Sequence, residues 1–261
     1  MLFPHDLPDA DVRHLPGWLP AADADALQRV LAQAIPWETH RIRMFGNWVD
    51  SPRLSCWIGD PQARYRYSGA EFIPHPWPPL LQELRIRLQE QSVGRFNSVL
   101  LNRYRGGTDY MGWHSDDEPE LGPAPLIASL SLGAARRFLL RRRDDTTRKA
   151  EFLLGHGDLL LMGGATQRHY QHALPKMARV QGERINLTFR WIHPRCPACE
   201  TGNLSASAPA CHSARWSASS PPRPAPPAAG HARTPLPLPT HRCCPPAATG
   251  GRCGRRPRAG W

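Results

Sequence analysis

Six short apolar runs follow one another between residues 98 and 192, and Gly, Pro or Asp clusters separate them. Short runs bounded by turn residues are typical of successive β-strands. Two helical patterns precede them: apolar residues recur at helical spacing in 21–34, and 79–91 begins with Pro and gathers leucines on one side. This order predicts a mainly β fold, a sandwich or barrel of short strands with flanking helices. The runs are SVLLNRY, LIASLSL, RRFLLRR, AEFLL, DLLLMG and RINLTFRWI.

The segment 195–261 differs in composition from the rest of the chain. It is rich in Pro, Ala, Ser and Arg and shows almost no apolar periodicity. Such a segment cannot bury enough surface to offset its chain entropy, so we expect it to be disordered. It holds nine Arg and a single acidic residue, which account for most of the net charge of +11. The body is therefore only mildly basic, and nucleic-acid binding would require a local basic face rather than net charge.

Cysteines in the same segment form an incomplete metal-binding pattern. Cys196 and Cys199 have the spacing of half a zinc site, but Cys211 and His212 do not have the spacing of the second half. We therefore do not expect a zinc site there.

The body carries few signs of an extracellular or membrane protein. Cys56 is the only cysteine before residue 195, so this part cannot form an internal disulfide, which fits a reducing compartment. No stretch approaches the roughly 18 consecutive apolar residues of a transmembrane helix. The N-terminus, MLFPHDLPDADVRHL, is acidic and interrupted by prolines, unlike a signal peptide. We expect a cytoplasmic protein without a membrane partner, and a monomer.

The run at 184–190, RINLTFR, alternates strictly between polar and apolar residues. On a strand, its apolar residues share one face, and the other face is polar. Burying two guanidinium groups without partners would cost several kcal/mol each. The polar face is therefore either solvated or lines a pocket filled with acceptors, such as a dicarboxylate, and the pattern alone leaves both open. The polar residues are Arg184, Asn186, Thr188 and Arg190.

A second constellation has the residue types of a metal site. His114 and Asp116 are two apart, so on an extended backbone their side chains point the same way. One imidazole, one carboxylate and a second His form the facial triad that holds iron(II) and leaves positions open for O₂ and a co-substrate. His156, His169 and His172 are candidates for the third ligand, and spacing does not choose between them.

Three stretches, NRYRGGTDYMGWHSDDEPELG, GATQRHYQHALPK and RINLTFRWI, resemble in this order the AlkB family of dioxygenases. They are most similar to the branch with the two mammalian nuclear DNA-repair homologues and their bacterial relatives. The resemblance covers roughly residues 36–193. It implies a double-stranded β-helix (jelly-roll) fold whose N-terminal nucleotide-recognition lid lies at about 40–70 and whose core lies at about 96–193. Residues 1–35 would then be an N-terminal extension with a helix.

The resemblance also implies a site. It assigns His172 as the third ligand beside His114 and Asp116, and it implies iron(II), 2-oxoglutarate and O₂ as cofactor and co-substrates. Arg184 and Arg190 would hold the two carboxylates of 2-oxoglutarate. Decarboxylation to succinate and CO₂ would produce an oxidant that hydroxylates an N-methyl group, which then leaves as formaldehyde. The implied 2-oxoglutarate residues are Asn102, Tyr104, Arg184, Asn186, Thr188 and Arg190.

Basic and aromatic residues interleave at 41–48 and 64–69. They form either a stacking surface for a base or the aromatic face of a β-hairpin. The resemblance favours base recognition, with Met44–Gly46 as a finger that probes the duplex and with acidic residues facing a cationic base. Residues 141–143 are a candidate phosphate contact or a solvated loop end. The implied substrate residues are Phe45, Gly46, Asn47, Arg53, Tyr65, Arg66, Tyr67, Asp117 and Glu118.

The resemblance thus implies oxidative demethylation of bases such as 1-methyladenine and 3-methylcytosine in single- or double-stranded DNA. An enzyme of this kind must flip the base out of a duplex or act on a single strand. RNA or another non-DNA substrate is the alternative. A catalytically silent nucleic-acid-binding module would predict a broken ligand set, whereas every member is present here.

Overall fold

The computed structural model describes residues 7–44, 47–67, 70–92 and 94–193 of the 261. Its helices are α1 (Ala21–Ala34), α2 (Pro79–Ser92) and α3 (Thr166–His169), with a 3-10 helix at Pro119–Leu121. Its strands are β1 (Asp11–Leu15), β2 (Arg41–Met44), β3 (Asn47–Asp50), β4 (Leu54–Gly59), β5 (Tyr65–Tyr67), β6 (Ala70–Phe72), β7 (Ser98–Tyr104), β8 (Met111–His114), β9 (Ile127–Gly133), β10 (Arg136–Arg142), β11 (Lys149–Leu154), β12 (Leu159–Gly163), β13 (Tyr170–Leu174) and β14 (Arg184–Arg190).

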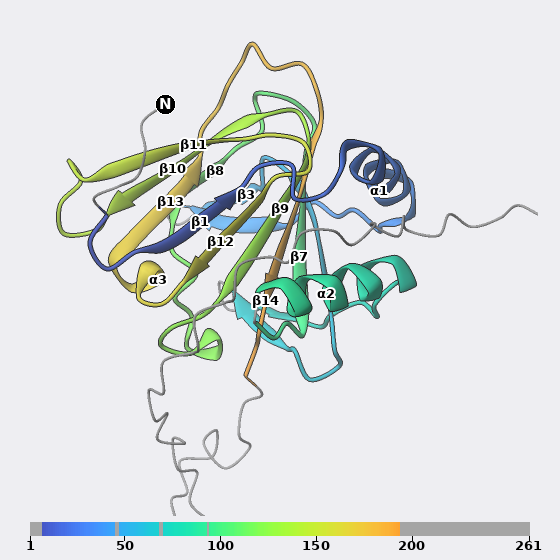
Figure 1. Cartoon of the computed structure of the whole chain (residues 1–261), viewed down its shortest axis with the longest axis horizontal. Helices are drawn as coiled ribbons and strands as arrows, with labels where there is room; N and C mark the ends of the chain where they lie inside the picture. The colour runs from blue at the N-terminus through green and yellow to red at the C-terminus, as the bar shows by residue number, and fades with distance from the viewer. Residues whose placement is uncertain (1–6, 45–46, 68–69, 93, 194–261) are drawn as a thin grey trace, which may run out of the picture. The chain divides into compact units, whose positions relative to one another are not determined.

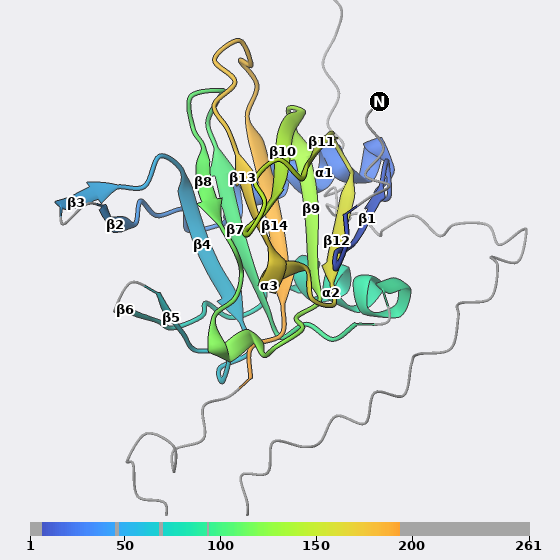
Figure 2. The same cartoon turned by 90° about the vertical axis from the view of Figure 1, so that its left-hand side faces the viewer.

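Two antiparallel sheets lie face to face (Figure 1, Figure 2). The larger has six strands in the order β1-β12-β9-β14-β7-β4, and the smaller has four in the order β11-β10-β13-β8. From β7 to β14 the chain alternates between the sheets, except that β10 and β11 are neighbours in the smaller one. This is the connectivity of an eight-stranded double-stranded β-helix, so the predicted jelly-roll fold is confirmed.

Helices α1 and α2 lie on the outer face of the larger sheet, away from the smaller sheet (Figure 1, Figure 2). Leu27 and Leu31 of α1 and Leu84 and Leu88 of α2 are buried in one cluster with apolar side chains of the sheet. Burial of each such side chain stabilises the fold by about 1.5–3 kcal/mol. Both predicted helices are confirmed, and α2 extends to Ser92. No helix in the described part of the chain is both long and apolar enough to cross a membrane.

Strand β14 lies within the larger sheet and pairs with β7 on one side and β9 on the other. All seven of its residues are buried. Ile185, Leu187 and Phe189 belong to the apolar cluster under the helices, so the alternate residues point toward the smaller sheet. The polar face therefore lines the space between the sheets, and the solvent-facing alternative is wrong.

The N-terminal segment contributes a strand to the larger sheet. Residues 11–15, which the resemblance placed in an extension before the domain, form β1 and pair in register with 159–163 of β12. The segment 195–261 lies outside the described residues. Cys56 is buried and free.

The predicted lid region holds two small hairpins, β2-β3 and β5-β6 (Figure 2). The register of the first pairs Met44 with Asn47, and Phe45 and Gly46 lie outside the described residues. The second pairs Tyr65 with Phe72. Strand β4 follows the first hairpin and joins the larger sheet beside β7, which attaches the hairpin to the core.

A buried carboxylate closes the turn between β11 and β12. Asp158 accepts hydrogen bonds from the backbone N–H groups of Gly155 and Gly17, both at 2.8 Å, and from His14 Nε2 at 3.0 Å. Burial acts to raise the pKa of Asp158, but these bonds outweigh it and the pKa lies below the usual 3.8. A depressed pKa means that this stabilisation is complete above about pH 4 and is lost as the pH falls through the folded-state value.

We expect Asp158→Asn to lower the free energy of unfolding by about 2 kcal/mol at neutral pH, because an amide cannot replace all three acceptor contacts. The loss should shrink below about pH 4, since the carboxylate of the unfolded wild-type chain is then being protonated while that of the folded chain is not. Urea unfolding at a series of pH values measures both effects. An equal loss at every pH would contradict this role for the carboxylate charge.

Candidate metal and co-substrate site

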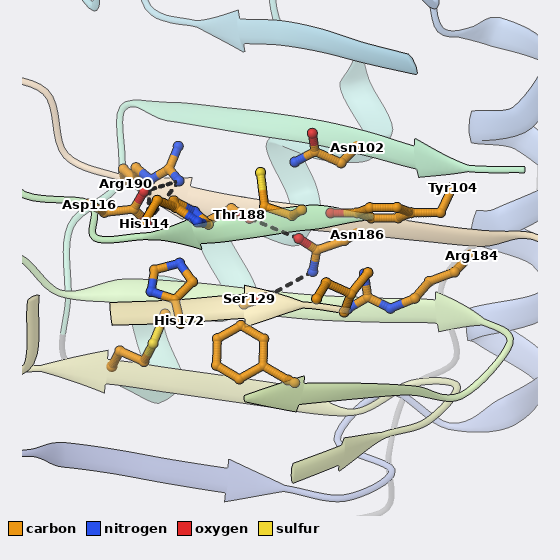
Figure 3. A pocket seen from close by; sticks show the side chains of 14 residues that line it. Asn102, Tyr104, His114, Asp116, Ser129, His172, Arg184, Asn186, Thr188 and Arg190 are labelled. Atoms are coloured by element: carbon orange, nitrogen blue, oxygen red, sulfur yellow. Dashed lines mark hydrogen bonds and ion pairs between the residues drawn. The ribbon is translucent and has the colours of Figure 1, made fainter. Parts of the chain in front are cut away.

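A pocket opens between the two sheets, and its walls are polar on the β14 side (Figure 3). Every 2-oxoglutarate residue implied by the resemblance lines it, as do the three implied metal ligands. The pocket has two ends: His114, Asp116, His172 and Arg190 lie at one, and Tyr104 and Arg184 lie at the other (Figure 3). The lining residues are Asn102, Tyr104, Met111, His114, Asp116, Ser129, Phe138, Met162, His172, Leu174, Arg184, Asn186, Thr188 and Arg190.

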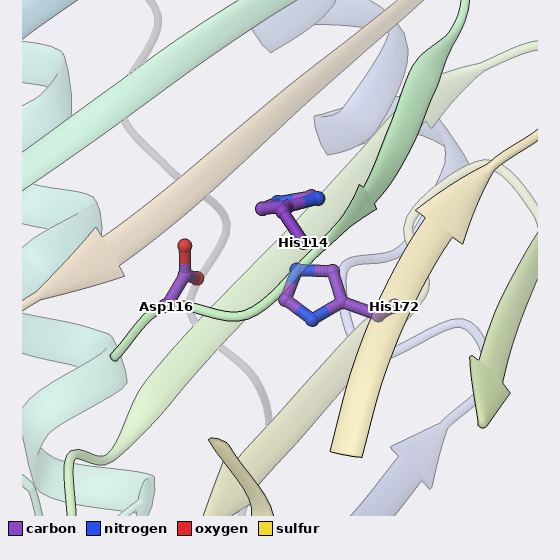
Figure 4. Close-up of side chains that lie close together, drawn as sticks. All are labelled: His114, Asp116 and His172. Atoms are coloured by element: carbon purple, nitrogen blue, oxygen red, sulfur yellow. The ribbon is translucent and has the colours of Figure 1, made fainter. Parts of the chain in front are cut away.

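Strand pairing brings the three potential metal ligands together. His114 at the end of β8 lies directly opposite His172 on β13, and Asp116 follows two residues after His114. One ligand atom from each of the three lies within 4.8 Å of the others (Figure 4). His156 and His169, the other candidates from the sequence, are not part of this group. Of the three candidate histidines, only His172 lies beside His114 and Asp116 in the structure.

A hydrogen bond orients one of the two imidazole rings of this group, and aromatic stacking orients the other. His114 Nδ1 lies 2.9 Å from the carbonyl oxygen of Gly112. A carbonyl only accepts, so Nδ1 carries the proton and leaves the Nε2 lone pair available. His172 stacks on Phe138, with ring centroids 5.3 Å apart and planes at 23°, which holds its orientation. Burial lowers the pKa of His172 to about 3, so it is neutral, as metal binding requires.

Asp116 and Arg190 form a buried ion pair at the same end. Arg190 Nη2 lies 2.8 Å from both carboxylate oxygens of Asp116, and its Nε lies 3.2 Å from one of them. Burial is the largest single influence on the pKa of Asp116 and acts to raise it, but the charge and hydrogen bonds of Arg190, together with the two neighbouring imidazoles, bring the pKa to about 2. The carboxylate is therefore ionised at neutral pH and can bind a cation.

Arg184 occupies the other end and lacks a counter-charge. It is 2% exposed and donates one hydrogen bond, from Nη2 to Ser131 Oγ at 2.9 Å. Its Nε is buried without a partner among the described residues, and burial lowers its pKa to about 10. An isolated buried guanidinium is unfavourable by several kcal/mol. A carboxylate entering the pocket would supply the missing acceptor.

Polar side chains between the two ends form a hydrogen-bonded row along β14 and β9 (Figure 3). Thr188 Oγ1 donates to Asn186 Oδ1 at 2.9 Å, and Asn186 Nδ2 donates to Ser129 Oγ at 2.8 Å. On β7, Asn102 Oδ1 accepts from Arg53 Nε at 2.8 Å. The row is internally satisfied, so it keeps its shape whether or not a ligand is present.

These residues fit a divalent iron ion and a dicarboxylate. Two neutral imidazoles and a carboxylate are the ligand set of non-haem iron(II) sites with open positions. Arg184, whose Nε has no partner among the described residues, lines a pocket that contains the metal ligands at its opposite end, as a bound 2-oxo dicarboxylate requires.

None of the implied substrate residues that the structure describes is among those that line the pocket. Arg53 contacts Asn102, and Asp117 forms a 2.6 Å ion pair with Arg143 at the surface. Glu118 is half-buried. Asn47, Tyr65, Arg66 and Tyr67 lie on the lid hairpins, and their side chains are outside the described structure.

Several lining residues were not identified from the sequence. Ser129 is a polar residue within the apolar strand IASLSLG, and it shares a face with Ser131, which could have marked this strand as pocket-lining. The apolar wall carries no such signal, because its residues look like ordinary core. That wall consists of Met111, Phe138, Met162 and Leu174.

Comparison with known proteins agrees with this geometry. Residues 11–190 match the family model of the 2OG-Fe(II) oxygenase superfamily. The mouse protein named DNA oxidative demethylase ALKBH2 is 40% identical over 183 residues, 66% of this chain and 77% of that protein. Human alpha-ketoglutarate-dependent dioxygenase alkB homolog 3 is 39% identical, over 69% of this chain and 65% of that protein. ALKBH2 of Arabidopsis thaliana is 35% identical, over 70% and 67% respectively.

The family match spans both sheets, and the relatives share more than a third of their aligned residues with this chain. The cofactors are therefore iron(II), 2-oxoglutarate and O₂. The chain belongs to the AlkB family of the 2OG-Fe(II) oxygenase superfamily and is an iron(II)- and 2-oxoglutarate-dependent dioxygenase.

Proposed function

We propose that this dioxygenase removes N-methyl groups from damaged bases in DNA, such as 1-methyladenine and 3-methylcytosine, and releases formaldehyde, succinate and CO₂. The observation that carries the proposal is the complete two-ended pocket, with the His114, Asp116 and His172 group at one end and the unpartnered Arg184 at the other. The relative named DNA oxidative demethylase, 40% identical, supports DNA as the substrate.

In this proposal His114, Asp116 and His172 hold iron(II), and Arg184 receives the carboxylate of 2-oxoglutarate that lies farther from the metal. When bound, the metal and co-substrate supply the oxidation of the methyl group with O₂. The protein supplies position and exclusion of water. Phe138 fixes the His172 ring, and Arg190 keeps Asp116 ionised.

The lid hairpins are proposed to present the base to this pocket. Tyr65 and Tyr67 would stack on it, and Phe45 would probe the duplex. Arg53 links the lid to the pocket, since it follows the first hairpin and its Nε donates to Asn102. Asp117 and Glu118 would face the positive charge of a base methylated at these positions.

The proposal predicts a mass change in a damaged oligonucleotide. Incubation of the protein with a 1-methyladenine or 3-methylcytosine oligonucleotide, iron(II), 2-oxoglutarate and ascorbate should remove the mass of one methylene group, detected by mass spectrometry. Formaldehyde and succinate should appear in equal amounts.

Parallel reactions on single-stranded DNA, duplex DNA and RNA of the same sequence define the substrate. Turnover of RNA alone would replace DNA by RNA in the proposal. No mass loss on any nucleic acid, from protein with bound iron that still converts 2-oxoglutarate to succinate, would reject nucleic-acid demethylation.

A further inference from the structure

Arg136 is a buried arginine outside the pocket lining. It begins β10 and is 0% exposed. Its guanidinium donates to three backbone carbonyls: Nη1 to Gly106 at 3.0 Å, and Nη2 to Asp109 and to Pro175, both at 2.8 Å. A side chain that satisfies three carbonyls fixes the chain segments to which they belong.

Those carbonyls come from two loops that lie against each other. Gly107, in the loop between β7 and β8, donates its N–H to Val180 O and accepts from Met177 N, both at 2.8 Å. A side chain at Gly107 would overlap the Met177 carbonyl, so the loops approach as closely as backbones allow. Arg136 joins the same two loops from the interior of the protein, through Gly106 and Asp109 on one loop and Pro175 on the other.

The two loops that Arg136 joins lie next to the Arg184 end of the pocket. Tyr104, at the end of β7, immediately precedes the first loop and lines the pocket. The guanidinium carbons of Arg136 and Arg184 lie 5.8 Å and 5.4 Å from the centre of its ring. Arg136 therefore supports Tyr104 from outside the pocket lining, while Arg184 contacts it from within.

The positive charge of Arg136 also lies near the Arg184 end of the pocket. Asp109 directs its carboxylate to Arg105, which binds it through Nε and Nη2 at 2.8 and 3.0 Å. In the described part of the chain, no carboxylate contacts Arg136 or Arg184. Two buried cations flanking one tyrosine favour an anion in the adjoining pocket.

We propose that Arg136 is a positioning residue for 2-oxoglutarate: it holds Tyr104 and the two loops in place and adds positive charge behind Arg184. This role rests on the proposed placement of the distal carboxylate at Arg184. Arg136 itself touches neither ligand nor metal. Its removal should weaken co-substrate binding while leaving the metal ligands, at the opposite end of the pocket, unchanged.

Calorimetric titration of 2-oxoglutarate into the Mn(II)-loaded protein, which has no turnover, tests the proposal. Arg136→Met should raise the dissociation constant about tenfold, equivalent to about 1.4 kcal/mol, with Mn(II) affinity unchanged. Arg136→Lys should fall between wild type and Arg136→Met, because an ammonium keeps the charge but cannot form the same three-way contact. If Arg136→Met fails to fold, Arg136→Lys becomes the test of the proposal. An unchanged 2-oxoglutarate affinity in the Arg136→Lys variant would then overturn it.

Arg85→Met is the matched control. Arg85 is a largely buried arginine of α2 that binds Asp60 at 2.9 Å and stacks on Trp77, away from the pocket lining. The Arg85→Met substitution should lower the melting temperature without changing the 2-oxoglutarate affinity. The positioning role is overturned if folded Arg136→Met binds 2-oxoglutarate like wild type, or if both variants weaken binding equally. Arg184→Met tests, independently of Arg136, the assumption that the carboxylate binds at Arg184. Normal 2-oxoglutarate binding in that variant would reject this placement.

Discussion

His172→Ala is expected to reduce demethylation and metal affinity by about a hundredfold or more, since even partners that contact a ligand typically contribute ten- to a hundredfold to metal affinity. His172 is the only candidate third ligand that the structure places beside His114 and Asp116. Its neutral ring, which is stacked on Phe138, is already oriented for binding. Iron content after reconstitution and succinate formation measure the two losses.

His169→Ala is the control for this prediction. His169 lies three residues away, it was an equal candidate from spacing alone, and it is outside the ligand group. Its replacement should leave iron content and turnover within about twofold of wild type, because it removes no member of the ligand group. Loss of iron in the His169 variant with retention in the His172 variant would show that the ligand assignment is wrong.

Arg190→Met is expected to destabilise the metal-free protein by about 3–5 kcal/mol, because it leaves the Asp116 carboxylate buried without a counter-charge. In the wild type the two side chains are 6–7% exposed and share bidentate contacts. Mn(II) should restore part of the stability, since the dication takes over as the partner of Asp116. Urea unfolding with EDTA and with Mn(II) gives both values.

A surface ion pair provides the comparison. Arg137 and Glu151 are also bidentate, but their side chains are 46% and 39% exposed. Arg137→Met should lower the stability by less than about 1 kcal/mol, with no response to Mn(II). If the two arginine variants lose similar stability, or if Mn(II) does not help Arg190→Met, the pair with Asp116 does not have the energetic importance assigned to it.

Much of the secondary structure was predictable because it depends on local periodicity. Helix α1 matches its predicted range, and RINLTFR forms β14 with polar and apolar residues on the expected faces. The joining of β1 to β12 was not predictable in the same way. DVRHL carries no strong strand pattern. It is a strand because it pairs with the edge of β12, far along the chain, from Asp11 opposite Gly163 at one end to Leu15 opposite Leu159 at the other.

The same distinction between local pattern and long-range contacts applies to the candidate site. Residues two apart on one strand, such as Asn102 and Tyr104, share a face by backbone geometry alone, so the sequence could place them on one wall of the pocket. The sequence could not show which strands form the opposite walls of the pocket, because that depends on contacts between segments far apart in the chain. Arg190 was expected to bind a carboxylate, but only the fold shows that Asp116 already provides one.

By itself, the sequence pattern predicted a mainly β fold, the alternating faces of β14 and two candidate metal ligands, because alternation within a strand depends only on the backbone. The tertiary structure decided which histidine completes the His-Asp-His group, since His172 reaches His114 through the pairing of β13 with β8. It also decided the role of Arg136. RRFLLRR shows only that Arg136 shares a face with Phe138 and Leu140, whereas the carbonyls that hold it belong to loops about 30 and 40 residues away on either side. Spacing along the chain cannot reveal those partners, because folding alone brings them together.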